Sequence, residues 1–153
     1  MVPGGSPCPG GWGCPTVIGL GGAEHLGIFV QAKVAPERCR GHQHVFHSPV
    51  IFVPRLERDN IVRVAEDTGR RLESTPGNEV FMIPLRGVGH YSVARGPLHA
   101  LGTDAACFAA LRSGLPPGIE LAGVDTDAEA PDFVGEAVGR LIGLGNATSI
   151  ERT

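Results

Sequence analysis

The feature that most constrains the fold is the run Glu79 to Leu85 (EVFMIPL), in which apolar residues occupy both odd and even positions. Side chains on a strand alternate between the two faces of its sheet, so a strand that is apolar at both parities is buried on both faces. Such strands are typical of parallel sheets covered by helices. The run therefore predicts an internal strand of an α/β domain.

Strand-length apolar runs alternate with helical patterns along the rest of the chain. This alternation predicts an α/β fold of three layers, a Rossmann-like and mainly parallel sheet with helices on both faces. One helix is expected over Glu57 to Glu73, because its apolar residues recur at spacings of three and four. The other expected elements are strands at Thr16 to Leu20, His44 to Phe46 and Ile119 to Val124, a helix at Thr103 to Leu115 capped by Thr103 or Asp104, and a last helix from Pro131.

The composition fits one globular domain. The 153 residues, 42% of them apolar, suffice to bury a core. The first residues are rich in Gly and Pro and bury little apolar area against their ordering cost, so they predict a flexible lead-in. We expect a lead-in at 1–14, a single α/β domain at 15–145 and a tail at 146–153.

Charge and hydropathy exclude two classes of partner. The formal net charge is −3, the isoelectric point is about 6.0, and Lys and Arg are scattered, so we expect no nucleic-acid binding. No apolar run reaches the roughly 20 residues that cross a bilayer, and the N-terminus does not resemble a signal peptide. We therefore expect a cytoplasmic protein that does not bind a membrane and whose four cysteines are reduced.

Polar residues gather in the loops that follow the expected strands. In open parallel sheets, ligands bind at the carboxyl ends of the strands, where loop amides and helix N-termini point. Four loops qualify by position: GLGGAEH, HSP, RGVGHYS and DTD. They offer a crevice that contains both acids and bases, namely Glu24, His25, His47, Ser48, Arg86, His90, Ser92, Asp125 and Asp127.

The loop GLGGAEH is a poor dinucleotide-binding loop. Gly19 and Gly21 match the first half of the G-x-G-x-x-G pattern, but Glu24 stands where the third glycine is needed, and a carboxylate there repels a pyrophosphate. The acidic residue expected about 20 positions later is also missing. A tight turn that uses glycine at positive φ explains the loop as well as ligand binding does.

The histidines at 42, 44 and 47 invite a metal-site interpretation, since residues two apart on a strand share a face. A zinc site needs three or four ligands, so Glu24 or Asp125 would have to complete this one from other loops. Solvated surface histidines explain the run better, and no metal is predicted. Cys107 lies on the apolar side of its helix and is interpreted as a core residue rather than a nucleophile.

Several motifs resemble one family. They are PERCRG (Pro36 to Gly41), HSP (His47 to Pro49), Arg55, IPLRGVG (Ile83 to Gly89), GPLH (Gly96 to His99) and Asp104-Ala105-Ala106. In this order the chain resembles, from about Gly13 to Leu144, the C-terminal domain of the uncharacterised microbial proteins related to the tomato mosaic virus resistance protein. PLRGV is the most specific element.

The resemblance implies a truncated or divergent member. Members of this family usually carry an N-terminal Rossmann-like domain, which binds ATP in the resistance protein, so ATP is implied only for a domain that this chain lacks. Some positions depart from the family pattern: Glu24 replaces an Asp, Gly89 and Ser92 replace Ser and Asp, and Ala100-Leu101 replaces Asp-Pro. Acid/base activity that depends on the replaced carboxylates is therefore in doubt.

Three functions follow from these residues. The first is binding of a small anionic metabolite, a carboxylate or phosphate, through the guanidinium of Arg86. The alternative interpretation of Arg86 is a structural salt bridge with Glu24 or Asp125. The second is a metal-independent hydrolase or lyase with Glu24 or His47 as general base. The third is a non-catalytic structural domain that pairs with a second copy or with a separate N-terminal-type domain. The residues expected to bind the ligand are Gly21, Gly22, Ser48, Arg86, Gly87, Ser92, His99 and Asp125.

Overall fold

The computed structural model describes residues 15–74 and 78–150, so the lead-in predicted at 1–14 lies outside the described residues. The main sheet is parallel and has the strand order β1-β5-β6. Its strands are β1 (Thr16–Gly19), β5 (Glu79–Pro84) and β6 (Glu120–Val124), in register from Thr16 opposite Glu79 and from Val80 opposite Glu120. The predicted parallel sheet is confirmed, with the EVFMIPL strand at its centre.

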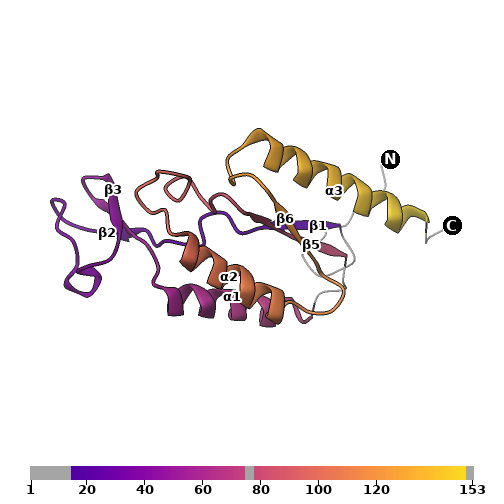
Figure 1. Cartoon of the computed structure of the whole chain (residues 1–153), viewed down its shortest axis with the longest axis horizontal. Coiled ribbons are helices and arrows are strands. Elements are labelled where there is room, and N and C mark those ends of the chain that lie inside the picture. The colour runs from indigo at the N-terminus through magenta and orange to yellow at the C-terminus, as the bar shows by residue number, and fades with distance from the viewer. Residues whose placement is uncertain (1–14, 75–77, 151–153) are drawn as a thin grey trace, which may run out of the picture.

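The sheet lies between two helical layers, as predicted (Figure 1). Helices α1 (Arg58–Leu72) and α2 (Leu101–Gly114) cover one face, and α3 (Pro131–Ile150) covers the other. Successive residues of β5 divide between the two cores: Phe81 and Ile83 pack with the α1 and α2 side chains, while Val80 and Met82 pack with α3. The double-sided apolar pattern of this strand therefore fixes the three layers.

The second sheet is antiparallel and was not predicted. It consists of β2 (Ile28–Phe29), β4 (Ile51–Pro54) and β3 (His44–Ser48), in the order β2-β4-β3. The strand predicted at His44 to Phe46 is confirmed as part of β3, but it pairs in this antiparallel sheet. Only Pro49 and Val50 separate β3 from β4, and two residues suffice for an antiparallel hairpin but not for the crossover that a parallel pair requires. A short 3₁₀ helix, Glu37–Cys39, precedes the hairpin.

Helices α1 and α2 pack very closely. A Cβ atom built on Gly69 would lie 2.3 Å from the carbonyl oxygen of Gly114, so this approach requires glycine in α1. Helix α2 begins before the predicted Thr103, with Ala100 as an N-cap that makes no side-chain hydrogen bond. The predicted cap by Thr103 or Asp104 is wrong, because the Asp104 carboxylate turns into the interior and pairs with Arg55.

The domain was predicted to end at residue 145, with a tail after it, but helix α3 continues to Ile150. Pro131 begins the helix, as predicted, because the missing N–H of proline costs nothing in the first turn. Within the described residues, no helix is both long and apolar enough to span a bilayer.

Candidate functional site

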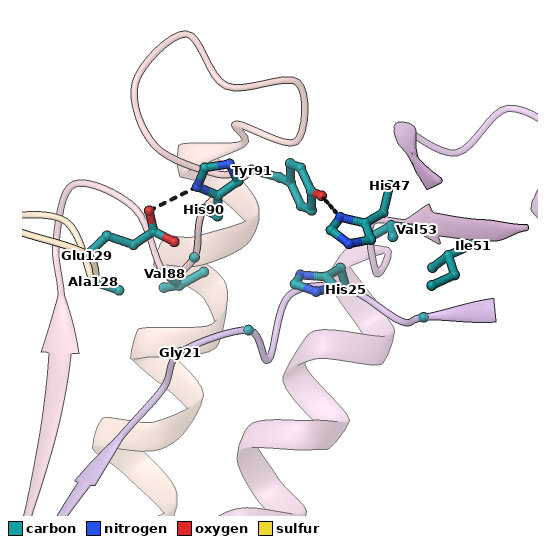
Figure 2. A pocket seen from close by; sticks show the side chains of 13 residues that line it. Gly21, His25, His47, Ile51, Val53, Val88, His90, Tyr91, Ala128 and Glu129 are labelled. Atoms are coloured by element: carbon teal, nitrogen blue, oxygen red, sulfur yellow. Dashed lines mark hydrogen bonds and ion pairs between the residues drawn. The ribbon is translucent and has the colours of Figure 1, made fainter. Parts of the chain in front are cut away.

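A pocket of about 600 Å³ lies beyond the carboxyl ends of β1 and β5, where the main sheet meets the small antiparallel sheet (Figure 2). The loop after β1 contributes Gly21, Gly22 and His25 to its wall, and the loop after β5 contributes Gly89, His90 and Tyr91. His47 enters from β3, and Glu129 from the segment between β6 and α3. Four segments distant in sequence thus meet at the edge where α/β proteins usually bind ligands.

Three imidazoles line this pocket, and each has its own polar neighbour. The Nδ1 atom of His47 lies 2.6 Å from the Tyr91 hydroxyl, and that of His90 lies 2.9 Å from a carboxylate oxygen of Glu129. The Nδ1 atom of His25 lies 3.1 Å from Glu24 Oε1. Because all three contacts use Nδ1, the Nε2 atoms are the ring nitrogens left for a ligand, as far as the described residues show.

Glu24 lies behind His25 and is completely buried. Neither carboxylate oxygen has a hydrogen-bond partner among the described residues, although Oε1 is within ion-pair distance of the His25 ring. The carboxylate occupies the space beside Gly89, where an added Cβ would lie 2.5 Å from Oε1. The loop after β5 therefore needs glycine at position 89 to accommodate this carboxylate.

A second buried charge cluster lies near Glu24. The guanidinium of Arg55 pairs with the Asp104 carboxylate and donates to the carbonyl of Leu98. Burial raises the pKa of Asp104 above its ordinary value, and the charge of Glu24 acts in the same direction, while Arg55 opposes both. The interior under the pocket thus holds two carboxylates and one guanidinium.

Among the predicted site residues, Gly21, Gly22 and His47 line the pocket. Gly22 adopts a φ of +74°, so this loop does use glycine to turn tightly. Its N–H donates to the carbonyl of Val88, which ties the loop after β1 to the loop after β5. The two predictions for this loop, a tight turn and a ligand-binding wall, are therefore compatible in the structure.

Ser92, Gly87 and His99 shape the loop after β5 rather than line the pocket. The buried hydroxyl of Ser92 accepts from the N–H of Gly89 at 2.9 Å and donates to its carbonyl at 3.0 Å. Gly87 has a φ of +151°, and an added Cβ would lie 2.8 Å from the Cα of Val93. His99 Nδ1 lies 3.0 Å from the carbonyl of Ser92. These contacts hold Gly89 and its neighbours in place.

Ser48, Arg86 and Asp125 also lie outside the pocket lining. The Ser48 hydroxyl accepts from the N–H of Val50 in the β3–β4 turn. Arg86 donates from Nε and one terminal nitrogen to the two carboxylate oxygens of Asp125, at 2.8 and 2.7 Å, and both side chains are exposed. The structure therefore does not bring Arg86 into one crevice with Glu24 and His47, and its fork already holds a carboxylate of the protein.

His25 and His90 lie in loops that the sequence predicts to form the crevice, but they were not among the predicted site residues, and neither was Tyr91 or Glu129. The signal that could have found the first pair is their position directly after glycine-containing turns. No comparable signal exists for Glu129, because only the fold brings this part of the β6–α3 connection beside His90.

The structure does not gather the histidines at 42, 44 and 47 around one point. The Nδ1 atoms of His42 and His44 contact the carbonyls of Arg55 and His42, whereas His47 faces Tyr91. Within residues 15–74 and 78–150, no group of three or more potential ligands could hold a metal ion. Cys107 is buried in the core, and this burial raises the pKa of its thiol to about 11, which does not suit a nucleophile.

Comparison with known proteins shows which family the chain matches. Residues 10–144 match the C-terminal domain of the uncharacterised protein family UPF0261. The chain is also similar to UPF0261 protein mlr3387 of Mesorhizobium japonicum, with 29% identity over 105 residues, which are 69% of this chain and 26% of that protein. The matched segment thus spans about a quarter of the length of this relative. The match covers every strand and most of the helical structure described above, so the chain belongs to the UPF0261 family through its C-terminal domain.

Proposed function

We propose that the pocket binds a small anionic metabolite, a carboxylate or a phosphate. The observation that carries this proposal is the convergence of three imidazoles and one phenol on a single cavity of about 600 Å³. An imidazole donates a hydrogen bond when neutral and adds a positive charge when protonated. Three such rings around one cavity favour an anionic ligand.

Side chains rather than backbone amides carry this recognition. The N–H of Gly22 is bonded to Val88, and that of Gly89 is bonded to the Ser92 hydroxyl, so these two loop amides are already used. In a phosphate-binding loop such amides point at the ligand instead. We therefore assign the anionic group to Nε2 of His47 and His90, with the Tyr91 hydroxyl between them.

Arg86 is not the anchor in this proposal. Its guanidinium makes two hydrogen bonds to Asp125 and lies outside the cavity, whereas His47 and His90 project into it (Figure 2). A ligand that bound Arg86 would have to displace the Asp125 carboxylate. The imidazoles need no such displacement at Nε2.

The resemblance to the tomato mosaic virus resistance protein remains part of the proposal. It implies that ATP binds to a domain other than the one described here, and we propose that this domain pairs with such an ATP-binding domain or with a second copy of itself. A cytoplasmic location, expected from the sequence, is also part of the proposal. The identified family supports the C-terminal-domain part of this resemblance.

The test is a thermal-shift screen of small carboxylates and phosphates on the wild type and on single His→Gln variants. His47→Gln and His90→Gln should each weaken the binding of a stabilising anion by about tenfold, since a hydrogen bond to a charged group contributes about 1.5–3 kcal/mol. The matched control is His44→Gln, an exposed histidine of β3 outside the pocket. The proposal would be contradicted if all three variants bound the anion as tightly as the wild type, or if no anion stabilised the wild type.

A further inference from the structure

The geometry points to a catalytic role for His25: we propose that it transfers the proton in the hydrolysis of an ester of a small anionic acid, with Glu24 as its positioning residue. The proposal rests on the anion pocket only for the placement of the substrate. It differs from the sequence-based hypothesis, which gave the role of base to Glu24 or His47.

Glu24 lies where a substrate cannot touch it. Its carboxylate is completely buried and faces no hydrogen-bond donor among the described residues except the nearby ring of His25. A solvent molecule therefore cannot reach Glu24 directly, so Glu24 is not itself the base that meets a substrate. His25 is partly exposed and lines the pocket, so it is the member of the pair that a substrate contacts.

Among the described residues, no hydrogen bond gives the Glu24 side chain a structural role. The loop is tied to the rest of the fold by backbone groups, since the carbonyl of Glu24 accepts from the N–H of Leu56 and the N–H of Gly22 donates to Val88. The nearby cation, Arg55, donates from its two terminal nitrogens to Leu98 and Asp104, and its buried Nε makes no hydrogen bond to Glu24. A buried carboxylate without partners destabilises a fold, so its presence beside a pocket imidazole indicates a functional pair.

The geometry of the pair suits proton transfer. Glu24 Oε1 and His25 Nδ1 are 3.1 Å apart but do not meet the angle of a hydrogen bond, and catalytic hydrogen bonds are often poorly aligned before a substrate binds. A small rotation of the ring would complete the bond. The carboxylate would then hold the Nδ1–H tautomer and direct Nε2 into the pocket.

The reaction balances with groups of this chain and water alone. Neutral His25 accepts a proton at Nε2 from a water molecule, whose oxygen forms a bond to the ester carbonyl carbon. The bond from this carbon to the alcohol oxygen then breaks, and His25 returns the proton to the departing oxygen. The products are an acid and an alcohol, and His25 is neutral again, while Glu24 stabilises the imidazolium that forms between the two steps.

Tyr91 provides the donor for the carbonyl oxygen. Its ring centroid lies 6.1 Å from that of His25, and its hydroxyl lies 2.6 Å from His47 Nδ1. When His47 carries its hydrogen on Nδ1 and donates it to the phenol oxygen, the hydroxyl hydrogen of Tyr91 is free to donate to the developing oxyanion. Tyr91 then serves the carbonyl oxygen instead of the anionic group, which is bound by Nε2 of His90 and by Nε2 of His47 when that ring is protonated.

The experiment measures the hydrolysis of two chromogenic esters by the full chain. One is 4-nitrophenyl acetate, and the other is the mono-4-nitrophenyl ester of glutaric acid, which carries a carboxylate. His25→Ala should lower kcat/KM by about 10²–10⁴-fold, and added imidazole should restore part of the activity by filling the space of the missing ring. His44→Ala is the matched control and should leave both the rate and the response to imidazole unchanged.

Glu24→Gln tests the positioning role separately. It should lower kcat by less than His25→Ala does and leave KM unchanged, because the substrate does not contact residue 24. Glu24→Asp, which keeps the charge, should recover part of this loss. If Glu24 had a merely structural role, Glu24→Gln would change the folding stability but not kcat/KM of the folded protein. If Glu24→Gln does not fold, the imidazole rescue of His25→Ala still decides the proposal.

The outcomes separate this proposal from the anion pocket. A wild type without saturable hydrolysis, or a His25→Ala variant as active as the wild type, overturns the catalytic role, and the anion screen can still succeed. Hydrolysis of 4-nitrophenyl acetate that depends on His25, with no preference for the anionic ester and no anion binding, supports the catalytic role and overturns the anion pocket.

Discussion

Arg55, which follows β4, and Asp104, in the first turn of α2, form an ion pair that is almost completely buried. The pair joins the small antiparallel sheet to the helical layer beneath the main sheet. Because Arg55 also donates to the carbonyl of Leu98, it contacts both the first turn of α2 and the loop just before that helix. This connection fixes the antiparallel sheet, and with it His47, relative to the loops of the main sheet.

Asp104→Ala should destabilise the fold by about 3–5 kcal/mol, because it removes the oxygen that accepts the hydrogen bond of Arg55 and leaves the buried guanidinium without its partner. Urea unfolding at neutral pH measures this free energy. The surface variant Asp67→Ala, which breaks exposed pairs with Arg70 and Arg71, is the control and should cost far less. Equal losses in the two variants would mean that the buried pair does not hold the sheets together.

The same residue predicts a pH dependence. The folded pKa of Asp104 is raised above the ordinary value of 3.8, so its stabilising contribution is complete below that value and is lost as the pH rises through the folded pKa. Urea unfolding from acid to neutral pH should therefore show a wild-type stability that falls, relative to Asp104→Asn, as the carboxyl ionises. A difference that grows in the opposite direction would show that Arg55 outweighs burial.

Arg86 and Asp125 provide a test of the surface pair. Their two hydrogen bonds lower the pKa of Asp125, so Arg86→Gln should return the titration of this carboxyl to its ordinary range. NMR titration of the Asp125 carboxyl carbon measures the change. The same variant should bind a stabilising anion as the wild type does, and lost binding would place Arg86 in the ligand site after all.

Cys107 should be unreactive in the folded protein. Burial raises the pKa of its thiol to about 11, so almost no thiolate is present at pH 8. Iodoacetamide labelling followed by peptide mapping should find Cys107 unmodified in the native state and modified in urea. Rapid native labelling would show that α2 opens away from the sheet.

The exposed apolar residues of α3, most of which line a groove beside the sheet, should cause association at high concentration. Val134, Val138, Leu141 and Ile142 are all about half exposed, beside a groove of about 390 Å³ between this helix and the sheet. Val138→Glu should shift the sedimentation profile toward the monomer. Val50→Glu is the matched control, since Val50 is an exposed apolar residue on the β3–β4 turn. A wild type that sediments as a monomer at every concentration would contradict this expectation.

The sequence by itself determined the order and type of the main elements. The double-sided apolar pattern of Glu79 to Leu85 predicted a central strand, and the spacing around Ile61 predicted α1 almost to its ends. These features depend on the period of the side chains along a strand or a helix, which is a local property that a short stretch of chain already contains. The placement of Gly21 and Gly22 at the cavity followed from this order, whereas His47 reaches the same cavity from the antiparallel sheet.

Only the tertiary structure decided which polar groups meet. The Tyr91 hydroxyl contacts His47, which is 44 positions away in the sequence. Asp104, which was predicted as a possible helix cap, instead forms a buried ion pair with Arg55. The antiparallel hairpin likewise depended on the length of one turn rather than on the composition of its strands. Buried polar and charged groups need a hydrogen-bond or ion-pair partner. Which group becomes the partner depends on how separate elements pack, because packing brings together residues that are distant in the sequence.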